Sequence, residues 1–360
     1  MSIAYQKVRK VLNSISRSTQ WKLVVLMLRW LNRGTCFGGI SYTLPAGDKI
    51  KFKGLEDGPE AVVNLNSPNA LKRALMSGYI GLAEGYIEGE WFTPSLSDLF
   101  DFGNANQRVL DRKLSGSYLG RITHKLSHFL RRNSRKGSQK NISAHYDLGN
   151  SFFSKWLDAS MTYSSALFTE RSQETIEDAQ LNKYRRIVEE LNIKPGHRVL
   201  EIGCGWGGFA EFLAKETKSE VTAITISREQ YEFSLKRIHN AGLDHLVNIE
   251  YCDYRDISGE YDRIVSIEML EAVGEAYWPS FFKILSDRLS DNGMAMIQVI
   301  TVPDTEFETY RKTVDFIQKF VFPGGMLLSP GKIDQHARAV GLIPDGSLFF
   351  AESYVQTLDI

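Results

Sequence analysis

The sequence predicts an α/β fold, in which a mainly parallel sheet carries helices on both faces and a smaller α+β domain precedes it. Strand-like and helix-like segments alternate through the second half of the chain, which is typical of βαβ units. One buried strand runs directly into a glycine-rich turn and a helix. With 360 residues, 43% of them apolar and 24% charged, the chain can bury a full core, which excludes disordered, collagen-like and disulfide-stapled proteins.

The amino-terminal domain is predicted to span residues 1–110. Residues 2–31 interleave apolar and basic side chains at helical spacing, which indicates a cationic amphipathic helix, although packing in a core explains the pattern equally well. Residues 38–64 predict short strands separated by turns at 45–48 and 56–59, where Pro, Gly and Asp cluster. We therefore expect a small α+β domain.

Residues 111–144 are polar, basic and rich in serine, which favours an exposed linker. Residues 1–47 hold seven basic side chains and residues 112–146 hold nine, and neither segment holds an acid. The chain has 43 basic and 43 acidic residues, so the rest carries 27 basic against 43 acidic side chains. This asymmetry indicates an anionic surface as partner, although an ordinary solvated face explains such runs too. The sequence shows no nucleic-acid-binding motif, so we expect anionic lipid rather than nucleic acid.

Cysteine and hydropathy patterns bear on the setting of the protein. The three cysteines are far apart and match neither zinc-site nor redox-motif spacing, which favours a reduced cytoplasmic setting without a metal. The longest apolar run, residues 23–28, is much shorter than the roughly 20 residues that span a bilayer. We therefore expect a cytoplasmic protein that lies on the inner membrane face as a peripheral protein. A homodimer is compatible with the sequence, which does not decide the oligomeric state.

The second domain is predicted to span residues 145–360. Its helices and strands alternate, and they are expected at the following ranges: helices at 181–191, 230–241 and 278–289, and strands at 198–202, 221–226, 247–251, 263–267 and 294–300. Residues 304–322 carry an apolar stripe at three- and four-residue spacing, which predicts one further helix.

The sharpest motif is the strand, turn and helix of residues 199–210, which contains G-x-G-x-G-G. Glycines at this place let the backbone approach a ligand at the carboxyl end of the strand, although a tight turn alone would also need them. A dinucleotide-binding domain would end its second strand with an acid, whereas residues 221–227 end in hydroxyls. Glu201 precedes the first glycine, which favours an adenosyl ligand with a cationic amino-acid tail.

Several short motifs follow one another along the chain in a specific order. They are GYIGLAEGYIEGEW (78–91), HYDLG (145–149), MTYSSALF (161–168), LEIGCGWGG (200–208), TISREQ (225–230), YRD (254–256), YDRIVSIEMLEAVG (261–274) and FPGG (322–325). In these motifs and their order the chain resembles the cyclopropane-fatty-acyl-phospholipid synthase family, which includes the mycolic acid cyclopropane synthases and uses S-adenosylmethionine. The similarity covers nearly the whole chain and implies a Rossmann-like class I methyltransferase fold.

The resemblance implies a set of residues that bind S-adenosylmethionine. Tyr163 and Ser164 match the pair that contacts its methionine part, and Gly203 and Gly205 match the loop beneath it. Thr225 and Gln230 match positions near the ribose, and Tyr254 matches an aromatic residue that borders the adenine. For the two tyrosines, plain core packing is the structural alternative.

The resemblance also implies a bicarbonate ion that accepts a proton beside the product cation. Glu271 matches the glutamate that holds this ion, and Ile300 matches an isoleucine whose main chain does so. Ser165 stands where the family has a cysteine that uses its main chain, and Gln298 stands where it has a histidine. A glutamine can donate a hydrogen bond to an anion but cannot titrate. Alternatively, an acid at the position of Glu271 caps the next helix.

The resemblance predicts a shortened carboxyl-terminal end. Family members continue through a tyrosine-bearing helix and a final strand, whereas residues 353–360 fall in the segment that leads into that helix. We therefore expect the bicarbonate-binding tyrosine and part of the acyl tunnel to be absent.

Together these features predict a methyltransferase that acts on the double bond of an unsaturated phospholipid acyl chain and gives a cyclopropane or a methylated chain. Two alternatives are open: a methyltransferase for a small soluble acceptor, and a scaffold that binds lipid or cofactor without catalysis.

Overall fold

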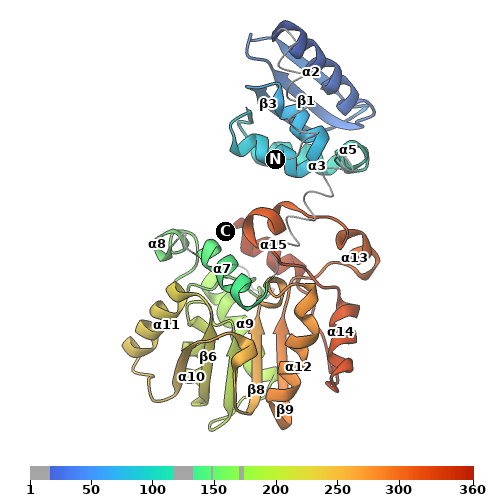
Figure 1. Cartoon of the computed structure of the whole chain (residues 1–360). Coiled ribbons are helices and arrows are strands. Elements are labelled where there is room, and N and C mark those ends of the chain that lie inside the picture. The colour runs from blue at the N-terminus through green and yellow to red at the C-terminus, as the bar shows by residue number, and fades with distance from the viewer. Residues whose placement is uncertain (1–16, 115, 117–132, 147–148, 170–173) are drawn as a thin grey trace. The chain divides into compact units, whose positions relative to one another are not determined.

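The computed structural model describes residues 17–114, 116, 133–146, 149–169 and 174–360. The chain divides into two compact units, which we describe separately (Figure 1). The first unit contains residues 1–127 and 314–316, and the second contains 128–313 and 317–360. Residues 2–16 of the predicted amphipathic helix lie outside the described residues, as do 117–132 of the basic segment.

The first unit is an α+β unit built on a four-stranded sheet in the order β2-β1-β3-β4. Strand β1 pairs antiparallel with β2 and parallel with β3, and β4 pairs antiparallel with β3. Helix α2 places Val24, Leu28 and Leu31 in the core of this unit, so core packing accounts for part of the amphipathic pattern. The elements are α2 (Arg17–Asn32), β1 (Phe37–Thr43), β2 (Lys49–Lys53), β3 (Glu56–Leu65), α3 (Asn69–Ile87), β4 (Trp91–Phe92), α4 (Leu96–Ala105) and α5 (Gln107–Lys113).

The predicted turn at 56–59 is wrong, because these residues begin strand β3. The register between β1 and β3 shifts there: Phe37 pairs with Glu56, but Gly39 already pairs with Glu60. A bulge of this kind accommodates Pro59, which cannot donate to the ladder. The backbones also approach closely, since a Cβ on Gly38 would lie 2.0 Å from the Pro59 carbonyl oxygen.

The second unit is a five-stranded sheet in the order β7-β6-β5-β8-β9, and every neighbouring pair of strands is parallel. This confirms the Rossmann-like α/β prediction. The strands lie close to their predicted ranges, since each hydrophobic run is bounded by turn residues. They are β5 (Arg198–Ile202), β6 (Glu220–Thr225), β7 (Val247–Tyr251), β8 (Tyr261–Ile267) and β9 (Leu289–Gln298).

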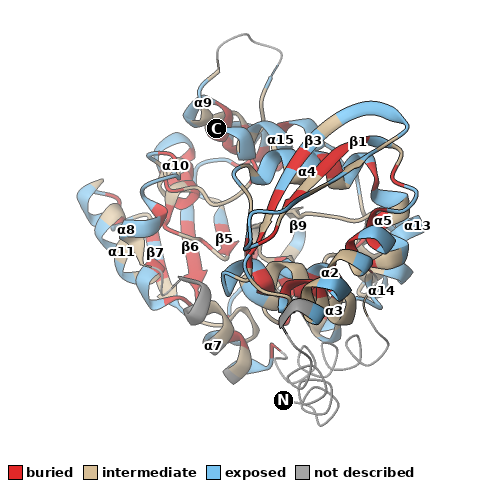
Figure 2. Cartoon of the chain, turned by 90° about the horizontal axis from the view of Figure 1, so that it is seen from above, coloured by how far each residue is buried: buried red, intermediate tan, exposed pale blue. Residues whose placement is uncertain are grey.

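Helices cover both faces of this sheet, and Figure 2 shows the buried residues concentrated on its inner strands. One core cluster joins α9, α10 and α11 to the sheet, and another joins α12, α13 and α14 to it. The helices are α7 (Arg135–Tyr146), α8 (Asn150–Phe153), α9 (Ile176–Glu190), α10 (Gly208–Thr217), α11 (Arg228–Asn240), α12 (Trp278–Arg288), α13 (Asp304–Tyr310), α14 (Pro330–Ala339) and α15 (Ala351–Asp359). Short turns of 3₁₀ helix lie at Tyr254–Asp256, Leu270–Ala272 and Glu275–Tyr277.

Two expectations for the second unit are corrected. The helix predicted over 304–322 ends at Tyr310, where Thr313 turns back and donates to the Tyr310 carbonyl through both its amide and its hydroxyl. The chain then forms a π-helical turn at Ile317–Val321. The segment predicted to be an exposed linker contains most of helix α7. Asn133, just before this helix, is buried, and its side-chain amide donates to the Ala272 carbonyl. The predicted domain boundaries themselves stay a prediction.

Candidate active site

The glycine-rich turn lies between β5 and α10, at the carboxyl end of the central strand. The backbone φ angles of Gly203 and Gly205 are +87° and +53°, a region that glycine adopts without steric cost. A Cβ on Gly203 would lie 2.8 Å from Cγ of Met269, whereas a Cβ on Gly205 would meet no atom within 4 Å. The turn therefore leaves open space above Gly205, next to the loop that follows β8.

Glu201 lies one residue before the end of β5 and is almost wholly buried. Its Oε2 atom has no hydrogen-bond partner among the residues that the structure describes. Burial raises the pKa of this carboxyl to about 8. An unpaired buried carboxyl is costly, so this position favours a ligand that brings a hydrogen-bond donor or a positive charge.

The residues predicted near the ribose lie together at the carboxyl end of β6. The Thr225 hydroxyl donates to Oε1 of Gln230 at 2.8 Å, and both side chains are buried. Thr225 Oγ1 also accepts from the Ser227 amide, so these two residues close the turn between β6 and α11. Tyr254 follows β7, where its ring packs edge-on against Phe281.

Tyr163 and Ser164 lie on the segment that precedes α9. The Tyr163 ring packs against Trp156 at 5.2 Å and is stacked on Phe322 with 6.5 Å between ring centroids. Ser164 is held by α9, because its hydroxyl accepts from Nζ of Lys183 at 2.6 Å and its carbonyl accepts from the Gln180 side chain. Burial, and then the charge of Glu268 in the loop after β8, raises the pKa of Tyr163.

The structure brings the four predicted catalytic residues together. Oε1 of Glu271 accepts from the Ile300 amide, so this carboxylate binds across to the chain after β9 and does not cap a helix. Its Oε2 is buried and has no hydrogen-bond partner within the described part of the chain. Gln298 lies at the end of β9, and its side-chain amide donates to the Ser165 carbonyl at 3.2 Å. Burial, and then the charge of Glu268, raises the pKa of Glu271 to about 8.

Sequence reasoning missed two charged residues at this site, Glu268 and Lys183. Oε1 of Glu268 accepts from the Ser165 amide and from the Gln298 side chain, each at 2.8 Å. Lys183 is buried, and its Nζ donates to the Ser165 carbonyl at 2.9 Å. Burial lowers the pKa of Lys183 to about 7, and Glu268 opposes that shift. The sequence pattern could have indicated both residues, because a charged side chain at a buried position is rare. Lys183 lies on the buried stripe of α9, and Glu268 directly follows a buried strand.

One further tyrosine, Tyr354, lies close enough to the carboxyl groups to feel their charge. The predicted absence of the bicarbonate-binding tyrosine stays a prediction. Tyr354 is on α15, and burial followed by the charges of Glu268, Tyr163 and Glu271 raises its pKa to about 12. Two hydroxyls of α15 fasten this helix to the segment after Ser165: Thr357 accepts from the Ala166 amide, and Ser353 accepts from the Phe168 amide. The phenol therefore stays protonated at neutral pH and can act as a donor.

A family model described as mycolic acid cyclopropane synthetase matches residues 133–360. The chain belongs to this family. Among curated relatives, tuberculostearic acid methyltransferase UfaA1 of Mycobacterium tuberculosis is 35% identical, over 82% of this chain and 70% of its own length. Cyclopropane-fatty-acyl-phospholipid synthase of Escherichia coli is 34% identical, over 81% of this chain and 73% of its own length.

Solved structures of cyclopropane synthases share the fold of the second unit. Mycolic acid cyclopropane synthase CmaA1 complexed with SAH and CTAB aligns with a TM-score of 0.57 and 29% identity, over 61% of this chain and 80% of its own. Cyclopropane synthase MmaA2 from Mycobacterium tuberculosis also aligns with a TM-score of 0.57, at 26% identity and the same coverage. As a member of the mycolic acid cyclopropane synthetase family, the protein is an S-adenosylmethionine-dependent methyltransferase.

The residues present fit this cofactor. The space above Gly205 and the unpaired carboxyl oxygen of Glu201 suit a ligand with a cationic amino-acid part. When bound, S-adenosylmethionine supplies an activated methyl group. Apart from Tyr163 and Ser164 on the segment before α9, the residues predicted to hold it lie at or beside the carboxyl ends of β5, β6 and β7, where parallel sheets bind ligands.

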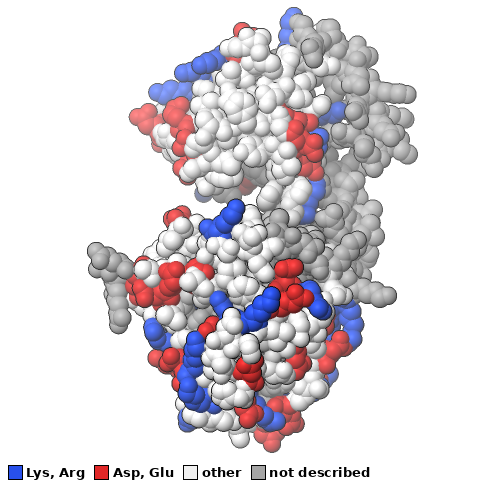
Figure 3. Space-filling view, turned by 90° about the vertical axis from the view of Figure 1, so that its left-hand side faces the viewer, with Lys and Arg blue, Asp and Glu red and all other residues white. Residues whose placement is uncertain are grey.

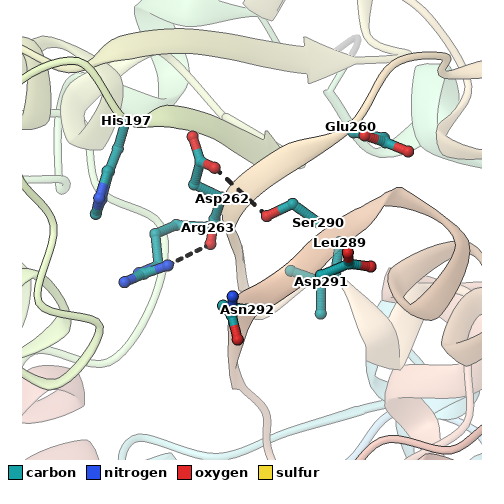
Figure 4. Close-up of a pocket in the computed structure, with 8 residues that line it drawn as sticks. All are labelled: His197, Glu260, Asp262, Arg263, Leu289, Ser290, Asp291 and Asn292. Carbon is teal, nitrogen blue, oxygen red and sulfur yellow. Dashed lines mark hydrogen bonds between the residues drawn. The ribbon is translucent and has the colours of Figure 1, made fainter.

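A polar pocket lies at the amino ends of the strands, opposite the glycine-rich turn, and is shown in Figure 4. Its lining comes from the amino ends of the strands: His197, Glu260, Asp262, Arg263, Leu289, Ser290, Asp291 and Asn292. Ligands of open parallel sheets bind at the carboxyl ends, so the pocket does not belong to the active site.

Proposed function

We propose that the protein transfers a methyl or methylene group from S-adenosylmethionine to the double bond of an unsaturated phospholipid acyl chain. The observation that carries this proposal is the pair of carboxyl groups of Glu268 and Glu271, two half-buried residues on the loop that approaches the glycine-rich turn through Met269. Burial raises the pKa of both carboxyl groups. A methylated alkene becomes a carbocation, and such an intermediate needs a proton acceptor beside an apolar substrate. The names of the curated relatives support the same substrate class.

The chemistry follows from the electron pairs that move. The π pair of the alkene forms the new bond to the methyl carbon, and the pair of the carbon–sulfur bond stays on sulfur. The neighbouring alkene carbon is left positive, and the faces of Tyr163 and Phe322 can stabilise that charge. Loss of a proton from the new methyl group closes a cyclopropane, whereas loss from another carbon leaves a methylated, unsaturated chain.

We also propose that the enzyme works at the cytoplasmic face of an anionic membrane, as a peripheral protein. The basic residues of the 1–47 and 112–146 segments support this proposal, at about 1 kcal/mol per cation near the lipid surface. Charges of both signs mingle on the face of the second unit in Figure 3, so the proposal rests on those segments alone. None of the described helices is both long and apolar enough to cross a bilayer.

The test uses purified full-length protein, labelled S-adenosylmethionine and vesicles of anionic phospholipid with one double bond per chain. We expect label in the lipid and a mass gain of one methylene per modified chain. Vesicles with saturated chains are the matched control and should stay unlabelled. Label in a water-soluble acceptor alone would support the small-acceptor enzyme, and cofactor binding without any mass gain would support a non-catalytic scaffold.

A further inference from the structure

Glu268 has a backbone conformation that side chains rarely adopt. It directly follows strand β8 and has a φ of +46°, where the Cβ of an L-residue crowds its own backbone. Its amide donates to the Gln298 carbonyl at 2.8 Å, which links the residue after β8 to the end of the neighbouring strand β9. A carboxyl side chain kept at such a position indicates a functional role.

The Glu268 carboxylate is held by two donors and balanced by one cation. The Ser165 amide and the Gln298 side chain both donate to its Oε1. Burial raises the pKa of Glu268, and the charge of Lys183, which also bonds to the main chain of Ser165, opposes that shift. Glu271 has no such cation among the causes of its shift, and the charge of Glu268 raises its pKa further. Of the two carboxyl groups, Glu268 is therefore the one that ionises first.

Glu268 and Glu271 bond to three of the residues that the family resemblance assigns to bicarbonate. Ser165 and Gln298 are engaged by Glu268, and the Ile300 amide is engaged by Glu271. A bicarbonate ion would have to displace a buried carboxylate and then lie beside it, where like charges repel. The residues as arranged do not fit this ion.

We propose that the carboxylate of Glu268 is the proton acceptor of this enzyme and takes the place of a bound bicarbonate ion. This inference rests on the proposed function. In the step, a C–H bond of the methylated carbocation breaks, its electron pair forms the new carbon–carbon bond of the ring or double bond, and the proton moves to an oxygen of Glu268. The proton passes to solvent after the product leaves, so the enzyme returns to its starting state.

The deciding variant is Glu268→Gly. A φ of +46° suits glycine, so the fold should be kept while the carboxylate is removed and the donors of Ser165 and Gln298 become free. In bicarbonate-depleted buffer we expect turnover of this variant to fall about 100-fold or more and to recover partly on addition of bicarbonate. The wild type should be indifferent to bicarbonate. Binding of S-adenosylhomocysteine, measured by calorimetry, should stay unchanged in the variant.

Two matched variants separate proton transfer from other effects. Glu268→Gln keeps the shape of the side chain but is a very weak proton acceptor, so it should lose turnover without rescue by bicarbonate. Glu260→Gln removes a carboxylate from the polar pocket at the amino ends of the strands and should keep full turnover.

A direct binding measurement keeps this inference distinct from the proposed function. In NMR titrations with isotopically labelled bicarbonate, the wild type should leave the signal unbroadened and Glu268→Gly should broaden it. Equal binding to both proteins, or wild-type turnover that stops when bicarbonate is removed, would overturn the role of Glu268. A wild type that modifies no unsaturated lipid would instead overturn the proposed function, and the titration would still decide whether Glu268 occupies the anion site.

Discussion

The amide of Ser165 donates to Oε1 of Glu268 at 2.8 Å, although 103 residues separate the two in the chain. This bond joins the segment before α9 to the end of β8, and the side chains of Lys183 and Gln298 close the same network on the Ser165 carbonyl. The acid–base groups of the site are therefore positioned by one short segment of main chain.

Replacing Lys183 with methionine should shift the acidic limb of the pH–rate profile. The lysine charge lowers the pKa of Glu268, so its removal raises that pKa and a higher pH is needed to ionise the carboxylate. We expect the acidic limb of the kcat/KM profile to lie about one pH unit higher than in the wild type. Lys183→Arg keeps the charge and should show a smaller shift, and identical profiles for all three proteins would remove Lys183 from the site.

Glu271→Gln should lose turnover and keep cofactor binding. The glutamine can still accept from the Ile300 amide, so the chain after β9 stays in place. Because the pKa of Glu271 is about 8, the group is mostly protonated at pH 7, and the variant should unfold at nearly the wild-type temperature. An amide cannot exchange a proton with the neighbouring Glu268, so we expect kcat to fall about 100-fold. Full activity of this variant would show that Glu271 takes no part in the reaction.

Gly205→Ala should weaken cofactor binding more than it destabilises the fold. Its Cβ meets no protein atom but enters the open space above the turn, and the φ of +53° costs about 1 kcal/mol in stability. Gly196→Ala is the matched control, because Gly196 has a φ of +82° and an equally open surrounding in a distant turn. Thermal unfolding should show similar losses for both variants, and calorimetry with S-adenosylhomocysteine should show weaker binding only for Gly205→Ala.

Glu201 should make the wild type less stable as the pH rises from 5 to 8. Its pKa is raised from 4.5 to about 8 in the folded state, so the folded protein binds more protons than the unfolded chain within that window. The stabilisation is complete below the unfolded pKa and is lost as the pH rises through the folded one. Glu201→Gln should reduce the slope of unfolding free energy against pH by up to about 1.4 kcal/mol per pH unit. Denaturant titrations at several pH values measure it, and equal slopes would show that the carboxyl is not buried.

Much of the second unit could be predicted from its sequence, because its cues are local. The runs at 198–202 and 247–251 match β5 and β7 residue for residue, since each apolar run ends at a turn residue. The prediction failed where a local cue was outweighed by a contact. Pro59 predicts a break in the strand, but the close approach of β1 allows β3 to continue through a bulge.

The sequence by itself determined the order of strands and helices and the glycine-rich turn, because spacing and glycine content act within a few residues, and its resemblance to a family implied the cofactor. Only the tertiary structure placed Glu268, Lys183 and Gln298 around the main chain of Ser165. These groups come from different elements, and their protonation depends on how far the folded chain excludes water and which charges it leaves nearby. Local sequence predicts neither burial nor the proximity of charges that are distant in the chain, so the pKa values of the site are set only on folding.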